Sequence, residues 1–125
     1  MKILLAVAGL LLGLAIGASL ARHFAAQHRY PRAVMAVAEA QLAQADGALR
    51  AGQCAQAADA LARLAATMGE VPRALPLTFA QEPQFRDELA RLQTALRPSE
   101  ADCHALGVRL RQVRQRCDDC HRVYR

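Results

Sequence analysis

The chain has 125 residues, enough for one domain. Apolar residues make up 54% of it, but 28 of these are Ala, only 4% of the chain is aromatic and there is no Trp. This composition favours helices and excludes a disordered chain and most all-β folds, which need β-branched and aromatic residues. The formal net charge is +5, and the chain has four cysteines.

The first feature along the chain is an uncharged run over residues 3–21, with Lys2 before it and Arg22 after it. As a helix it would be roughly 28 Å long, close to the thickness of a bilayer's hydrocarbon core. Gly9, Gly13 and Gly17 give it a small-residue face, which suits packing against another membrane helix but is also common in export signals. We therefore expect residues 1–29 to comprise an uncleaved membrane anchor or a cleaved signal peptide together with a short tether over 22–29.

Four amphipathic segments follow, each with apolar residues spaced alternately three and four positions apart. Gly52 breaks the pattern after the first, Gly69, Pro72 and Pro76 after the second, and Pro98 after the third. Ser99 and Asp102 resemble a capping box before the fourth segment. The apolar stripes cover residues 35–49, 54–68, 85–96 and 103–124.

This pattern predicts an all-α fold in which residues 30–125 form an up-down-up-down antiparallel four-helix bundle. In that topology the start of the first helix and the end of the fourth lie at the same end of the bundle. Cys54 and Cys103, which open the second and fourth helices, lie at the other end.

One motif points to chemistry: Cys117-Asp118-Asp119-Cys120-His121 is C-x-x-C-H, the attachment pattern of c-type haem. Residues three apart on a helix share a face, so both thiols can reach the two vinyl groups on one edge of a porphyrin. The next residue, His121, can then bind the iron. Other interpretations are a redox dithiol, a chance pair, or half of a zinc site completed by Cys54, Cys103 or His104. We expect His104 to be exposed rather than a ligand.

The ending Cys117-x-x-Cys120-His121-x-x-Tyr124-Arg125 resembles the close of the cytochromes c prime, the class II c-type cytochromes. Two weaker likenesses are the stretch from Tyr30 to Met35, similar to the start of that family's first helix, and Leu75-Pro76 with Phe79, similar to the connection before its third. Pro31 falls where the family has Arg, and the family's usual Trp is missing. The resemblance implies a four-helix bundle with one haem c attached near the C-terminus.

The resemblance also implies roles for individual residues. Cys117 and Cys120 would form thioethers, and His121 would be the proximal iron ligand. Met35 would lie on the distal side, either as the sixth iron ligand or as an apolar cap, but a core Met fits its stripe equally well. Arg125 would lie near the proximal face and the propionates, unless it is simply a solvated C-terminal Arg. Tyr124 and Phe79 would pack on the haem or in the core.

The two remaining cysteines, Cys54 and Cys103, are expected to form a disulfide. An even cysteine count in an oxidising compartment, two thiols used by haem, and placement at one bundle end all favour it. The alternative is that both are small buried thiols on the core stripes.

These features predict a periplasmic monohaem cytochrome, soluble or tethered to the inner membrane, that transfers one electron and is not an enzyme. A five-coordinate haem protein that binds NO or CO, and a disulfide-stabilised helical binding module without haem, are the alternatives. The haem-attachment machinery and a redox partner are the expected partners. The Arg-rich fourth helix is either a solvated face or a docking surface for an acidic redox partner. The resemblance alone suggests a homodimer, and nucleic acid is not an expected partner.

Overall fold

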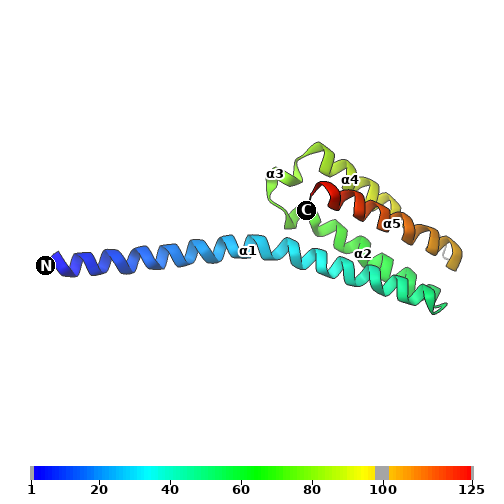
Figure 1. The fold of residues 1–125 in the computed structure, drawn as a ribbon, viewed down its shortest axis with the longest axis horizontal. Coiled ribbons are helices and arrows are strands. Elements are labelled where there is room, and N and C mark those ends of the chain that lie inside the picture. The colour runs from blue at the N-terminus through cyan, green and yellow to red at the C-terminus, as the bar shows by residue number, and fades with distance from the viewer. Residues whose placement is uncertain (1, 98–101, 125) are drawn as a thin grey trace.

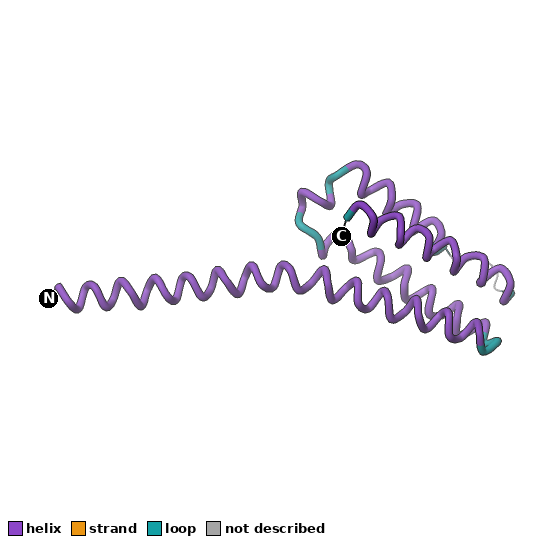
Figure 2. Tube along the Cα trace, viewed as in Figure 1, coloured by secondary structure: helices purple, strands orange, loops and turns teal. Residues whose placement is uncertain are grey.

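The computed structural model describes the backbone of residues 2–97 and 102–124, and their side chains except those of 2–6, 8 and 25–28. This part of the chain is all-helical and contains no strand, which confirms the predicted all-α class. Its helices are α1 (Lys2–Arg50), α2 (Cys54–Ala74), a single turn α3 (Leu77–Ala80), α4 (Pro83–Ala95) and α5 (Cys103–Val123). They form a helical bundle from which the first half of α1 projects (Figures 1 and 2).

Helix α1 is the main departure from the sequence-based expectation. The segment 22–29, expected to be a tether, is helical and joins the apolar run to the bundle without a break. Its Ala, Arg and Gln residues are strong helix formers, and Pro31 removes only one backbone donor from the long helix. Among the described side chains of α1, Val34 is the first that is buried, so the helix packs against the bundle from just after Pro31.

In the projecting half of α1, the described side chains are mostly apolar and all exposed as far as Phe24. This half contributes to the single helix among the described residues that is long and apolar enough to cross a membrane, with a mean hydropathy of 1.4 and no burial within that window. A signal sequence has the same properties.

The turn between α1 and α2 is built around Gly52, which has a φ of +72°. Only Gly adopts this left-handed conformation without a steric penalty, and it lets the Gln53 N–H return to the Ala48 carbonyl at 2.8 Å. Helix α2 then continues past Gly69 and Pro72 to Ala74, beyond the expected break.

Small side chains fill the contact between α1 and α2. Ala45, Ala57 and Ala60 are fully buried, and such small residues let two helix axes approach closely. At the edge of this contact Thr67 donates a hydrogen bond to Gln41 at 2.9 Å, and Arg63 donates one to Gln44 at 3.0 Å. Larger residues from α2, α4 and α5 complete the core, the most buried being Leu61, Leu64, Val71, Leu96, Leu106 and Val113.

The predicted disulfide between Cys54 and Cys103 is confirmed, with 5.2 Å between their Cα atoms. It joins the first residue of α2 to the first residue of α5. Beside it, Asp102 caps α5 by accepting a hydrogen bond from the Ala105 N–H at 2.7 Å. Ser99, expected in a capping box with Asp102, lies outside the described residues. We call this part of the bundle the disulfide end, and the opposite part, with α3 and the last turn of α5, the motif end.

Candidate functional site

The C-x-x-C-H residues occupy the last turns of α5, at the motif end. Cys117 continues the apolar stripe of Leu110 and Val113, both buried, and packs against the core. Cys117 and Cys120 are half-buried and free, whereas His121 is exposed. The two thiols therefore line the inner side of α5, and the imidazole stands at its solvent-exposed border.

Burial keeps both thiols protonated. Desolvation raises the pKa of Cys117 to about 11, helped by the nearby negative charges of Cys120 and Asp118. The pKa of Cys120 is also raised, first by desolvation and then by the carboxylate of Glu88. Neither thiol is the low-pKa nucleophile of a redox dithiol, so the environment argues against that interpretation.

The acidic residues inside the motif serve the outer surface of α5. Asp119 pairs with Arg122, accepts a hydrogen bond from Gln115 at 3.1 Å and lies 3.6 Å from Arg116. Desolvation alone would raise the pKa of Asp119, but these hydrogen bonds and positive charges outweigh it and lower the pKa. This network joins side chains of the last two turns of α5 on the solvent-exposed side of the helix.

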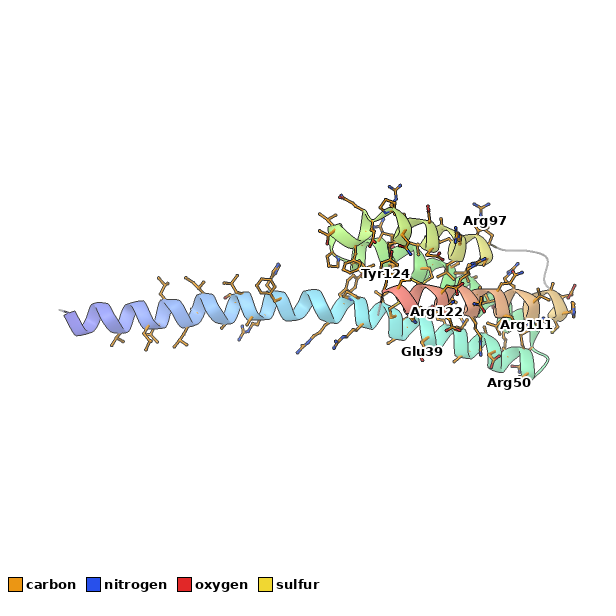
Figure 3. The ribbon with its side chains drawn as sticks, turned by 45° about the horizontal axis from the view of Figure 1, so that its top comes forward. Glu39, Arg50, Arg97, Arg111, Arg122 and Tyr124 are labelled. Atoms are coloured by element: carbon orange, nitrogen blue, oxygen red, sulfur yellow. A yellow bond between two sulfur atoms is a disulfide. The ribbon has the colours of Figure 1, made fainter. Side chains whose placement is uncertain are left out.

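Tyr124 lies at the centre of an aromatic cluster just after the motif. Its ring meets Phe79 edge-on at a centroid distance of 6.0 Å and Phe85 at 5.4 Å, and Figure 3 shows Tyr124 at this end of the bundle. Helix α3, which the sequence pattern did not reveal, presents Phe79 to this cluster. Tyr124 also packs against the core.

Two buried polar atoms at this end have no hydrogen-bond partner: Glu88 Oε2 and the Tyr124 hydroxyl. Unpartnered buried polar groups are costly, and in native proteins they often mark a place where another group binds. Burial raises the pKa of Tyr124, and the Glu82 carboxylate, which is close enough to interact with the hydroxyl, raises it further, as do the negative charges of Cys120 and Glu88. Glu88 was not predicted as a site residue, although its position between Phe85 and Leu92 on the buried face of α4 was a usable signal.

Of the remaining predicted residues, the structure describes Met35 and His104 but not Arg125. Met35 is half-buried on α1 and packs against the same core as Cys117. Arg125 lies outside the described residues. His104 is exposed at the disulfide end, as expected.

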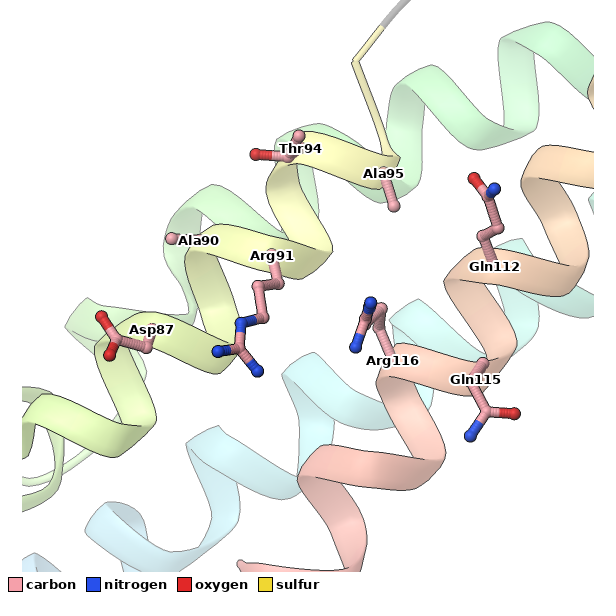
Figure 4. A pocket seen from close by; sticks show the side chains of 8 residues that line it. All are labelled: Asp87, Ala90, Arg91, Thr94, Ala95, Gln112, Gln115 and Arg116. Atoms are coloured by element: carbon pink, nitrogen blue, oxygen red, sulfur yellow. The ribbon is translucent and has the colours of Figure 1, made fainter.

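Two clefts lie on the surface of the bundle. The larger, of about 730 Å³, lies between α4 and α5, and Arg91 and Arg116 extend into it (Figure 4). Both arginines are already engaged, Arg91 with Glu88 at 3.1 Å and Arg116 with Asp119. The second, of about 560 Å³, is formed mainly by α4, with Pro72 and Ala80 at its border. Neither cleft is lined by Cys117, Cys120 or His121.

Zinc and haem c require different donor sets from the described residues. Among the described residues, no three His, Cys, Asp or Glu side chains converge into a metal site, and the disulfide occupies the two cysteines that a zinc site needed. Haem c needs only two free thiols on one helix face with an adjacent imidazole, and Cys117, Cys120 and His121 supply these. At the same end, Glu88 Oε2 and the Tyr124 hydroxyl are polar atoms without a well-formed hydrogen bond.

A scan against protein-family models finds no match to this chain, and searches of curated proteins and of solved structures find none either.

Proposed function

We propose that the chain is an exported monohaem c-type cytochrome, an up-down-up-down four-helix bundle that transfers one electron on the periplasmic side of the inner membrane. The observation that supports it most is the division of the four cysteines. Cys54 and Cys103 are joined at one end, and Cys117 and Cys120 remain free on one face of α5 beside His121.

Each residue of the motif has a part in holding the group. Haem supplies a one-electron couple at its iron, with a potential set by the axial ligands and their surroundings. Cys117 and Cys120 would hold it through thioethers, and His121 would bind its iron. Phe79, Phe85 and Tyr124 would give the group an aromatic neighbour at this end, with Phe85 buried and Phe79 partly exposed. The haem-attachment machinery is proposed as a partner, because it would join the group to Cys117 and Cys120.

Met35 decides between electron transfer and gas binding. If Met35 also held the iron through its sulfur, the group would supply electron transfer, whereas a Met35 that is only an apolar neighbour would leave the iron able to bind NO or CO. Met35 packs against the core from α1, which is compatible with either role. We propose the ligand role.

The variants Met35→Leu and Met68→Leu separate these roles, because both keep the volume of the core. Met68 is buried on α2 and has no proposed ligand role, so it serves as the matched control. If Met35 is a ligand, only its variant turns high-spin and gains rapid CO binding when reduced. A wild-type protein that is already high-spin and binds CO contradicts the ligand role and supports the gas-binding function.

The basic face of α5 is proposed to dock an acidic redox partner. Arg114 bridges to Asp46 of α1 at 3.2 Å, whereas Arg111 is exposed and has room to meet a partner's carboxylates. Such docking depends on ionic strength, so the bimolecular electron-transfer rate should fall as salt rises.

The cysteine pairs test the haem proposal directly. In cells that carry the attachment machinery, Cys117→Ser with Cys120→Ser should give colourless protein after denaturation. The matched pair Cys54→Ser with Cys103→Ser should keep the haem absorbance. Equal colour in both variants, or haem that acidic organic solvent extracts from the wild type, overturns the proposal and leaves the helical binding module without haem.

A further inference from the structure

The exposed apolar side chains of the bundle gather at the motif end. From residue 30 onward, the large hydrophobic side chains that are exposed among the described residues are Tyr30 (51%), Val37 (48%), Leu77 (74%), Phe79 (45%) and Val123 (54%). They belong to the packed part of α1, to α3 and to the end of α5. No described large hydrophobic side chain is comparably exposed at the disulfide end. Concentration at one end indicates a surface that something covers.

Arginines surround this apolar surface. Arg29 and Arg32 are exposed on α1, Arg73 is exposed in the last turn of α2, and Arg122 is exposed in the last turn of α5. Glu70 pairs with Arg73 and Asp119 with Arg122. The first acidic residue of the whole chain is Glu39, so all the charged residues of α1 before it are basic. Apolar side chains bordered by arginines are typical of surfaces that contact anionic lipid headgroups.

The course of α1 places this surface near a bilayer. The apolar half of α1 projects from the motif end, and α3 lies on the same side of the bundle (Figure 1). If the run over residues 3–21 spans the membrane, Tyr30 lies about 13 Å beyond its last apolar residue at 1.5 Å per residue. A headgroup layer is roughly 5–8 Å thick. Transmembrane helices are ordinarily tilted by about 20° from the bilayer normal. Such a tilt moves the part of the bundle that lies two helix widths, about 20 Å, from α1 roughly 7 Å toward the membrane. This movement is similar to the distance that separates the headgroup layer from the level of Tyr30.

We infer that the motif end is a second membrane contact, in which Leu77, Phe79 and Val123 rest among anionic phospholipid headgroups and the surrounding arginines bind their phosphates. This inference rests on the anchored form of the proposed function and is independent of haem. It turns the C-x-x-C-H motif toward the membrane surface and the disulfide end away from it.

The absence of Trp from the chain gives a clean probe, because each introduced Trp is the only one. The full chain is placed in nanodiscs of phosphatidylglycerol and phosphatidylcholine, with and without a headgroup-attached nitroxide quencher. The ratio of Trp emission with and without quencher is measured for Leu77→Trp at the motif end and for Gln53→Trp at the disulfide end. Phe24→Trp in the projecting half of α1 reports whether α1 has inserted.

We expect strong loss of emission for Leu77→Trp and Phe24→Trp and little for Gln53→Trp. Adding Arg73→Glu and Arg122→Glu to the Leu77→Trp protein should restore its emission, as should discs of phosphatidylcholine alone. The matched control, Arg50→Glu with Arg111→Glu at the disulfide end, should leave the quenching unchanged.

Three results overturn the inference. One is quenching of Phe24→Trp without quenching of Leu77→Trp, which shows an anchored chain whose bundle stands clear of the lipid. Another is a Leu77→Trp side chain shielded from both the lipid quencher and aqueous iodide, which shows a second copy or a protein on this surface. The last is a chain that does not enter the discs. Haem absorbance after denaturation is recorded separately, so failure of the haem proposal is distinguishable from each of these.

Discussion

The two ends of the bundle use the same residue type for opposite purposes. At the disulfide end, Cys54 and Cys103 come from two helices whose starts lie 5.2 Å apart at the Cα atoms, and they are cross-linked. At the motif end, Cys117 and Cys120 lie on one helix and remain free thiols. The disulfide end also has a satisfied helix cap, whereas the motif end has two unpartnered buried polar atoms and uncovered apolar side chains.

This difference shows how placement decides what a cysteine does. A disulfide between two helix starts constrains the unfolded chain and stabilises the bundle without further ligands. Two thiols on consecutive turns of one helix add little by pairing with each other, but they present two attachment points at a fixed spacing. The end that is complete by itself is structural, and the end with unused groups is where we place the function.

The largest expected effect on stability comes from breaking the disulfide end. Replacing Cys54 and Cys103 by Ala releases a cross-link between residues 49 apart. The chain-entropy account predicts a loss of about 4 kcal/mol in the free energy of unfolding. Urea unfolding followed by circular dichroism measures it, with the wild type under reducing conditions as the matched comparison. A loss below about 1 kcal/mol would show that the disulfide end holds together without its cross-link.

The second effect concerns the reactivity of Cys117 at the motif end. Burial raises its pKa to about 11, so the reactive thiolate forms only as the pH approaches that value. In haem-free Cys120→Ser protein, where Cys117 is the only free thiol, alkylation at pH 8 should be roughly tenfold to a hundredfold slower than in an unfolded control. Desolvation, the largest cause of the raised pKa, remains in this variant, so the rate should still be rising above pH 9, the ordinary value for a thiol. A rate that levels off near pH 9 would show that Cys117 is solvated.

A smaller effect is expected at the start of α5. Asp102→Ala removes the side chain that accepts a hydrogen bond from the Ala105 N–H at 2.7 Å. Loss of such a cap costs about 1 kcal/mol of stability. The exposed Asp87 has no capping role, so Asp87→Ala is the control in the same urea titration. Equal losses in both variants would place the effect in surface charge rather than in the cap.

The smallest effect has the opposite sign and lies at the motif end. Tyr124→Phe keeps the edge contacts with Phe79 and Phe85 but removes a buried hydroxyl without a partner. The haem-free variant should be slightly more stable than the wild type, because the folded state no longer holds a hydroxyl that lacks a well-formed hydrogen bond. Tyr30→Phe, at an exposed ring, should change nothing. A loss of stability in Tyr124→Phe would reveal a hydrogen bond that this account omits.

The sequence predicts much of this architecture because its signals are local. The period of the apolar stripes locates the packed helices. Gly52 marks a turn whose left-handed backbone conformation favours glycine. The disulfide follows from the topology, since two helices that start at the same end bring Cys54 and Cys103 together. C-x-x-C-H is equally local, and it locates the candidate site without any structure.

What the sequence does not predict depends on tertiary context. The continuity of α1 through Pro31 and of α2 through Pro72 requires weighing one lost donor against many helix-forming neighbours. Helix α3 is too short to show a period, yet it brings Phe79 to Tyr124. Glu88 Oε2 is buried without a partner because α4 packs against α5. The spacing of residues within α4 does not predict that contact.

The central claim is that one end of this bundle is cross-linked and the other carries haem. Full-length protein produced with the haem-attachment machinery would be digested without reduction and mapped by mass spectrometry. The account predicts, in the same molecules, a peptide pair joined through Cys54 and Cys103 and a peptide carrying haem on Cys117 and Cys120. A colourless protein whose Cys117 and Cys120 are free thiols, or are joined to each other, would contradict it.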